Sequence, residues 1–292
     1  MKKQKTVSIK AKLLGVIIPV VIAIVVVLVV AAYQISAGTI KKYSQNLLQS
    51  SVENQASQIE AWLNENLASF QMAKTIIEDL KPSDEELKTI LDGYYGYNSN
   101  YPEGLYVADS TGQLITASES TKKESDVTNS TWYKEGLTRV NMAVGSAYQN
   151  ADGVNVISAS GILNDGSDKV RVISADMTLD RIAIIVNSFI EMNDAEAFLV
   201  DKTSGVILAN RDSSLISQTL GAEGQSHFYQ LTAEKAAEKD YNFATLDGNM
   251  TVFQEVDGTN WLLISYIPTS IVLSDLTQLR NIMIVILSLI HI

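Results

Sequence analysis

The strongest hydrophobic pattern in this sequence is an uncharged run over residues 13–32, rich in Val and Ile. At a rise of about 1.5 Å per residue, about 20 helical residues cross the roughly 30 Å hydrocarbon core of a bilayer. The run therefore predicts a transmembrane helix over residues 13–33. A cleaved secretory signal is the alternative, but its apolar part usually spans only about 7–15 residues. The helical pattern also continues beyond the run, which favours an uncleaved anchor.

A second helical pattern follows the anchor over residues 36–80. Proline is absent between residues 33 and 80, and Gly38 is the only glycine there. Apolar side chains recur mostly at sums of three and four residues, at Ile40, Leu47, Val52, Ile59, Leu63, Leu67, Phe70, Ile76 and Leu80. Such a helix, about 65–70 Å long, is either a plain coiled-coil stalk or packs on a domain. Trp62 and Phe70 favour packing for its upper part. The stripe over residues 40–67 also offers a face to a second copy, so a homodimer is expected.

Beyond residue 80 the pattern changes to short alternating segments, which are typical of strands. Lys81 and Pro82 end the long helix, and Ser83 with Glu86 predicts a capping box for a short helix up to residue 91. A hairpin is predicted over residues 105–117, strands over 145–149, 154–163 and 170–177, and helices over 132–140 and 179–189. The order then restarts with a hairpin over 197–209, strands over 241–245, 250–255 and 261–267, and a return helix over 270–280. The echo predicts an α+β fold with two antiparallel-sheet modules in tandem, a distal one over 83–189 and a proximal one over 190–269.

Charge gives the orientation of the anchor. Five lysines and no acid precede it, at Lys2, Lys3, Lys5, Lys10 and Lys12, whereas all 33 acidic residues lie between residues 34 and 280. The positive-inside rule therefore places residues 1–12 in the cytoplasm and residues 36–280 outside the cell. So acidic a segment argues against nucleic acid as a partner.

The last residues open a second apolar run. Residues 281–292 are expected to start a second transmembrane helix, which is incomplete because a span needs about 20 residues. Residues 287–292 also match the translation of a transposon adaptor that is common in sequencing libraries. We therefore expect the natural chain to differ from residue 287 onward, which resequencing of the native locus would test.

Residue types suited to metal or covalent chemistry are scarce. The chain has no cysteine and only two histidines, His227 and His291, so thiolate and histidine-rich metal sites are not expected. It holds no Gly-x-Ser-x-Gly, no His-Glu-x-x-His and no phosphate-binding loop. The sequence therefore favours a binding or sensing protein without a cofactor over an enzyme.

Four short motifs follow one another between the two apolar runs. They are Asp-Ser-Thr-Gly at 109–112, Thr-Trp-Tyr-Lys at 131–134, Ala-Tyr at 147–148 and Val-Ile-Ser-Ala-Asp-Met-Thr-Leu at 172–179. In this order they resemble the double Cache sensor of bacterial methyl-accepting chemotaxis proteins of the clostridial type, over residues 36–280. The resemblance implies two PAS-like modules flanked by transmembrane helices, a small polar ligand outside the cell and a cytoplasmic output in chemotaxis. The sensor half of a histidine kinase or diguanylate cyclase would present a similar outer half. A membrane-anchored binding or adhesion protein is a further alternative, which does not need the second helix.

The same resemblance indicates where a ligand would bind. In relatives that bind amino acids, an arginine and aromatic residues hold the carboxylate and a later aspartate takes the ammonium. The candidates that correspond here are Trp132, Tyr133, Glu135, Tyr148 and Asp176, whereas Ser130 stands in place of the arginine and Ser125 in place of a tyrosine. Without the arginine the bidentate grip on a carboxylate is missing. An aromatic face beside Asp176 suits an amine-bearing ligand instead.

Three of these candidates also have a purely structural interpretation. Trp132 on a short helix can be a core anchor, Tyr148 can simply pack on its strand, and Asp176 can cap the helix that starts near residue 179. The sequence leaves both interpretations open.

Overall fold

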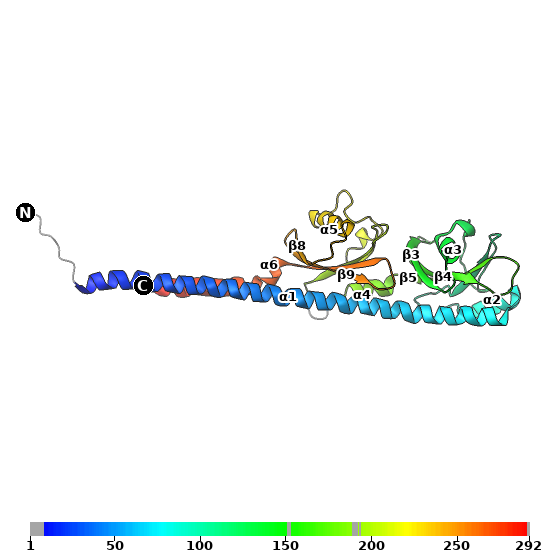
Figure 1. Ribbon diagram of the computed structural model, residues 1–292, viewed down its shortest axis with the longest axis horizontal. Helices are drawn as coiled ribbons and strands as arrows, with labels where there is room; N and C mark the ends of the chain where they lie inside the picture. Colours follow the sequence, from blue (N-terminus) through cyan, green and yellow to red (C-terminus); the bar gives the residue numbers. More distant parts are fainter. Residues whose placement is uncertain (1–8, 151–152, 189–191, 193, 291–292) are drawn as a thin grey trace, which may run out of the picture.

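The computed structural model describes residues 9–150, 153–188, 192 and 194–290. Two sheet modules lie one after the other along the same side of a single long helix, and the described chain begins and ends toward the end of this helix that carries no sheet (Figure 1). The α+β class and the two tandem antiparallel modules predicted from the sequence are confirmed.

The long helix α1 (Ile9–Leu80) runs unbroken from the apolar run to the tip of the molecule. Within the described part of the chain, it is the one helix that is long and apolar enough to cross a membrane. It ends where Lys81 adopts a φ of 49° directly before Pro82. The predicted capping box then starts α2 (Asp84–Asp92): the backbone N–H of Ser83 donates to the Glu86 carboxylate at 2.9 Å, and the Ser83 hydroxyl accepts from the Glu86 backbone. One continuous helix therefore joins the predicted anchor to the distal module.

The distal module is a five-stranded antiparallel sheet in the order β2-β1-β5-β4-β3. Its strands are β1 (Leu105–Asp109), β2 (Leu114–Ile115), β3 (Ala143–Gln149), β4 (Asn155–Leu163) and β5 (Arg171–Thr178). A 3-10 turn, η1 (Val127–Asn129), and the short helix α3 (Thr131–Gly136) connect β2 to β3, and α4 (Asp180–Val186) leads out of the module. The chain between β2 and η1 has no regular secondary structure and becomes important at the site below.

The proximal module repeats this topology in the order β7-β6-β10-β9-β8. Its strands are β6 (Glu196–Asp201), β7 (Ile207–Asn210), β8 (Ala244–Leu246), β9 (Asn249–Val256) and β10 (Trp261–Pro268), with η2 (Ser213–Leu215) and α5 (His227–Ala237) between β7 and β8. The chain then returns through α6 (Thr269–Val272) and α7 (Ser274–Ile290), which lies beside α1 (Figure 1). The two modules also share their first turn, which Asp109 and Asp201 brace with side-chain bonds to the backbone two residues on.

Two helices end earlier than predicted, and one was not predicted. The helix expected over 132–140 ends at Gly136. The prediction was too long because Leu137 and Val140 continue the apolar spacing, but their side chains are 42% and 71% exposed. The helix expected over 179–189 ends at Val186, and residue 189 lies outside the described residues. Helix α5 went unrecognised because only Phe228 and Thr232 are buried along it, which leaves almost no apolar stripe.

The core lies between α1 and the two sheets. Leu48, Val52, Ile59, Phe70 and Ile77 on α1 are all completely buried. Most of the stripe over residues 40–67 is therefore packed within the chain: Val52, Ile59 and Leu63 lie in the core cluster, and Leu47 and Leu67 pack against it. A homodimer through this helix stays a prediction. At the junction of the modules, the Gln55 amide donates to three carbonyl groups at the end of α4, those of Ile185, Val186 and Ser188.

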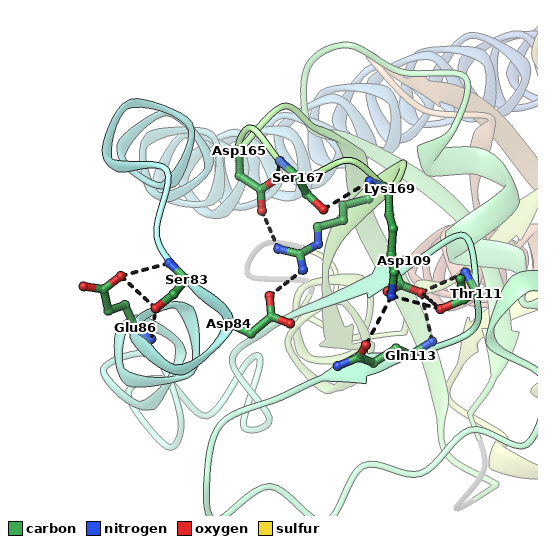
Figure 2. Close-up of polar contacts among 10 residues, drawn as sticks. Ser83, Asp84, Glu86, Asp109, Thr111, Gln113, Asp165, Ser167 and Lys169 are labelled. Atoms are coloured by element: carbon green, nitrogen blue, oxygen red, sulfur yellow. Dashed lines mark hydrogen bonds and ion pairs between the residues drawn. The ribbon is translucent and has the colours of Figure 1, made fainter.

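A network of charged side chains ties α2 to the distal sheet at the tip of the molecule (Figure 2). The buried guanidinium of Arg171 donates to Asp165 at 2.8 Å and to Asp84 at the start of α2. Burial by itself would lower the pKa of Arg171, but the two carboxylates outweigh it and raise the pKa. In the turn before β5, Lys169 donates to Asp109, which lies at the end of β1, at 2.6 Å. The three buried charges of this network, Arg171, Asp165 and Asp109, each have an opposite charge within contact distance, as burial requires.

Candidate ligand-binding site

A hollow of about 510 Å³ opens on the distal module. Its charged lining residues are Glu103, Lys122, Lys123, Glu124 and Asp176. Its neutral polar lining includes Ser125, Asn129, Ser130, Thr131, Tyr148 and Gln149, and Pro102, Val154 and Val156 add apolar surface. The walls come from the ends of β3, β4 and β5 and from the irregular chain that leads into α3. This volume and mixed lining are typical of a site for a small polar molecule.

Asp176 on β5 is the most strongly bonded group in this hollow. Its Oδ1 accepts hydrogen bonds from the hydroxyl groups of Tyr106 at 2.5 Å, Tyr148 at 2.8 Å and Ser158 at 2.6 Å. Its Oδ2 accepts a hydrogen bond from Lys122 Nζ at 2.6 Å. The side chains of Asp176 and Lys122 are each only 8% exposed. Asp176 is thus a buried carboxylate held by three hydroxyl groups and one ammonium group.

The register of the sheet brings these hydroxyl groups together. Ser158 lies directly opposite Asp176 in the β4–β5 pair, and Tyr106 lies opposite Ser174, two residues before Asp176, in the β1–β5 pair. Because side chains alternate between the two faces of a strand, positions two apart and directly opposite positions share a face. Tyr148 reaches the same carboxylate from β3.

The two tyrosine hydroxyl groups remain protonated donors over the physiological range. Burial is the main cause that raises the pKa of Tyr106 far above its ordinary value, and the charge of Asp176 raises it further. Burial and then the charge of Asp176 likewise raise the pKa of Tyr148. Loss of either proton would place a second negative charge beside Asp176 in a buried place, which is strongly unfavourable.

Trp132 and Tyr133 lie in the core beside the site and do not line the hollow. Trp132 is completely buried and meets the Tyr106 ring edge to face, with ring centroids 4.9 Å apart and an interplanar angle of 84°. Its Nε1–H donates to Glu124 at 2.9 Å. Trp132 therefore supports two groups of the site from behind, Tyr106 and Glu124.

Glu135 lies away from the hollow. Its carboxylate pairs with Arg139 at 3.4 Å and accepts from the backbone N–H of Ser146. It lines a separate depression of about 300 Å³ where Asp201 and residues 258–261 of the proximal module also lie. Of the five candidates from the sequence, the structure brings Tyr148 and Asp176 into one site, places Trp132 and Tyr133 beneath it and separates Glu135.

Lys122, Tyr106 and Ser158 are site residues that the sequence did not single out. Alternation along β1 and β4 could have indicated Tyr106 and Ser158 once Asp176 was chosen. Lys122 carries no such signal, because it lies in irregular chain 54 residues before its partner. Ser130 and Ser125, the two positions at which the resemblance led us to expect an arginine and a tyrosine, both line the hollow.

The corresponding face of the proximal module is filled by aromatic rings. Asp201 and Asp109 occupy equivalent strand ends, so Phe198 on β6 corresponds to Tyr106 and Tyr266 on β10 corresponds to Asp176. Phe198 and Tyr266 pack with Phe228 of α5, with centroids of Phe228 and Tyr266 4.4 Å apart. An aromatic ring, that of Tyr266, thus occupies the position that carries the buried charge of Asp176 in the distal module. Among the described residues, no group of three or more metal-ligating side chains lies together in either module.

The Cache domain family model matches residues 32–276 of this chain. The chain belongs to the Cache domain family. Among solved structures, this Cache domain is similar to the ligand-binding domain of Mlp24 with asparagine, at 17% identity and a TM-score of 0.65, covering 82% of this chain and 97% of that one. It is also similar to the ligand-binding domain of the Pseudomonas fluorescens chemoreceptor CtaA in complex with L-isoleucine, at 20% identity and a TM-score of 0.64, covering 82% and 98%. The ligand-binding domain of the Campylobacter jejuni chemoreceptor Tlp3 in complex with L-norvaline matches at 17% identity and a TM-score of 0.63, covering 80% and 94%.

These similarities establish that the Cache domain shares its two-module fold with chemoreceptor ligand-binding domains. A comparison with curated protein sequences gives no match.

Proposed function

We propose that this chain is the sensing half of a transmembrane chemoreceptor, whose distal module binds a small polar ligand outside the cell. The observation that carries the proposal is the hollow of about 510 Å³ around the buried Asp176, at the part of the molecule farthest from the predicted anchor. In this reading the N-terminus is cytoplasmic and α1 and the continuation of α7 cross the membrane.

The similar structures support the kind of ligand. They hold asparagine, L-isoleucine and L-norvaline, all small molecules with an amino group. In this chain Ser130 and Ser125 line the hollow in place of an arginine and a tyrosine, so the groups that would grip an α-carboxylate are missing. We assign ligand contact to Asp176 and Tyr148, and we expect an amine-bearing ligand whose remaining polar groups meet hydroxyl and amide side chains. Trp132 and Tyr133 act by packing beneath these residues.

Helix α1 gives a route for the signal. It packs against both sheets and continues into the predicted anchor, and α7 returns beside it, with Val26, Val29 and Tyr33 facing Arg280 and Met283. Ligand binding transmits a signal only if the ligand binds one arrangement of these helices more tightly than another. Since most of the stripe over residues 40–67 packs within the chain, we expect a homodimer to use the exposed apolar side of α1, where Met72, Ile76 and Leu80 follow at four-residue spacing. Analytical ultracentrifugation tests this, and a monomer at high concentration would exclude it.

The type of cytoplasmic output domain is proposed from the family alone. A histidine kinase or a diguanylate cyclase would use the same outer half, and chemotaxis is our first choice because the similar solved domains named above include chemoreceptors. A membrane-anchored adhesion protein fits less well, because α7 continues the chain as a helix beside α1 up to Ile290.

The function is tested by a thermal-shift screen of residues 36–280 against amino acids, amines, carboxylates, purines and sugars. A ligand at about 100 times its Kd stabilises the fold by about 2.7 kcal/mol, which is an easily measured shift. The hit should disappear in Asp176→Asn and weaken in Tyr148→Phe. Asp168→Asn is the matched control, because Asp168 is an exposed acid of the same module that does not line the hollow.

The variants separate the outcomes. A hit that survives Asp176→Asn and Tyr148→Phe would refute the assigned site. The absence of any hit across the screen would count against a small-molecule sensor.

A further inference from the structure

Lys122 makes the contacts that a ligand's ammonium group would make in this site. Its Nζ lies 2.6 Å from Asp176 Oδ2 and 4.2 Å from the centroid of the Tyr106 ring. A buried carboxylate together with an aromatic face is the environment that binds a cationic nitrogen, by a charge-assisted hydrogen bond and by cation–π attraction. The position is therefore already filled by a side chain of the same protein.

Asp176 Oδ1 is fully used by three hydroxyl groups, so a cationic ligand has to approach Oδ2, where Lys122 already lies. Each carboxylate oxygen has about two lone-pair sites. Tyr106, Tyr148 and Ser158 donate to Oδ1, and Lys122 donates to Oδ2. The three hydroxyl groups belong to strands of the sheet, whereas Lys122 belongs to irregular chain. Lys122 is the one partner that can leave without distorting the sheet.

The backbone on both sides of Lys122 is held independently of its side chain. Before it, Ser118 donates to Asp92 and Ser120 donates to Glu103. After it, the Glu124 carboxylate accepts from Trp132. The lysine side chain can therefore move out of the site while these contacts keep the chain in place.

We propose that Lys122 is a tethered occupant of the ligand's ammonium position, and that a ligand with a cationic nitrogen binds by exchanging with it. This inference rests on the proposed function of the hollow as a ligand site. The exchange keeps Asp176 paired, because one ammonium group replaces another, so neither state leaves an isolated buried charge. The released Lys122 remains near Glu103 and Glu124, the other two carboxylates of the hollow.

The exchange implies that the ligand is a cation. With Lys122 in place, its charge neutralises that of Asp176. With Lys122 released, the site is negative, so neither state attracts an anion strongly. The tether also lowers the apparent affinity for every cation by the fraction of time that the position is free. If it is free in a tenth of the molecules, the apparent Kd is tenfold weaker than the intrinsic one.

Chemical rescue in the full chain, purified in detergent micelles, tests the exchange. Lys122→Ala removes three methylene groups and the ammonium group, which n-propylammonium chloride supplies again. The melting temperature is followed by tryptophan fluorescence while n-propylammonium chloride is titrated, with sodium chloride at equal ionic strength as the reference. We expect n-propylammonium to stabilise Lys122→Ala with an apparent Kd at least tenfold lower than for the wild type.

Two further variants keep the test decisive. Lys122→Gln retains a donor to Asp176 and so preserves the fold, and it should gain affinity in the same direction. Lys88→Ala removes an exposed lysine of the same module that does not line the hollow, and it should respond as the wild type does.

Either of two results overturns the exchange. One is equal stabilisation of the wild type, Lys122→Ala and Lys122→Gln by n-propylammonium. The other is stabilisation of the wild type by sodium butyrate that is lost in both Lys122 variants, which would make Lys122 the receptor of an anion. The rescue experiment uses a simple amine, so its result does not depend on the ligand screen. If n-propylammonium fails to rescue while the screen gives a hit that needs Asp176, the proposed exchange is refuted and the proposed function stands.

Discussion

Replacing Asp109 with asparagine removes the charge from a buried carboxylate while it keeps one acceptor oxygen for the turn. Asp109 is 1% exposed at the end of β1. Its Oδ1 accepts from the backbone N–H groups of Thr111 at 2.8 Å and Gln113 at 3.1 Å, and its Oδ2 accepts from Lys169 at 2.6 Å (Figure 2). Asparagine can replace Oδ1 but presents an NH₂ group to Lys169, so the variant isolates the ionic part of this contact.

The expected magnitude follows from the pKa of Asp109. Burial alone would raise this pKa, but the bonds from Lys169, Thr111 and Gln113 outweigh burial and lower the pKa from 3.8 to about 2. One pKa unit corresponds to about 1.4 kcal/mol, so the ionised carboxylate contributes about 2 kcal/mol to the free energy of unfolding at pH 7. Because the folded pKa is the lower one, this contribution is complete above about pH 4 and is lost as the pH falls toward 2.

The assay is urea unfolding of residues 36–280 between pH 2.5 and 7, with wild type and Asp109→Asn compared at each pH. The difference should be about 2 kcal/mol at neutral pH and should shrink steadily below pH 4. It should also fall with added salt, since the Lys169 side chain is 40% exposed. Asp201→Asn is the matched control, because Asp201 braces the equivalent proximal turn with bonds to Thr203 and Ser204. A difference for Asp109→Asn that stays constant from pH 2.5 to pH 7 would refute the reasoning.

Three further substitutions test packing and bonding. Gly136→Ala should destabilise the distal module by about 1–3 kcal/mol in urea unfolding, because the new Cβ would lie 2.3 Å from Val172 Cγ1, and an unchanged midpoint would contradict this. Ile59→Ala, at a completely buried position of α1, should cost about 2–5 kcal/mol in the same assay, and a loss below 1 kcal/mol would contradict its place in the core. Tyr106→Phe should cost about 1.5–3 kcal/mol, because a hydrogen bond to a charged group is lost at Asp176. It should also weaken any hit that depends on Asp176, which calorimetric titration can measure.

The repeated module could be predicted because its signals are local. Each sheet begins with a strand, a turn opened by Asp109 or Asp201, and a glycine at Gly112 or Gly205 with φ of 85° or 71°. Short segments rich in apolar residues between glycine-containing turns then indicated β4, β5, β9 and β10. Helix α5 was missed for the opposite reason, since it covers its sheet with few apolar side chains.

The site was predictable only where it lies on strands. Asp176 and Tyr148 followed from motifs at fixed places in the sheet. The role of Trp132 depended on which side of α3 faces the core, and no spacing within a six-residue helix decides that. The pairing of Lys122 with Asp176 depended on how a segment without periodicity lies over the sheet, which only the tertiary structure shows.

Because α1 is continuous, it fixes the angle about its own axis between the predicted anchor and the two modules. An alanine inserted after Gly38, below both modules, would turn everything above it by about 100° and lift it by about 1.5 Å relative to the part below. Seven inserted residues would return it to within about 20° of the original angle. Helix α7 is attached to the proximal module and turns with it, so the one-residue insertion rotates α7 relative to the part of α1 below Gly38. The seven-residue insertion nearly restores this angle and adds a shift of about 10.5 Å along the axis. If the chain transmits a signal as proposed, and if that signal depends on the angle between the helices, the response of an insertion series should follow the period of the helix rather than the number of residues added.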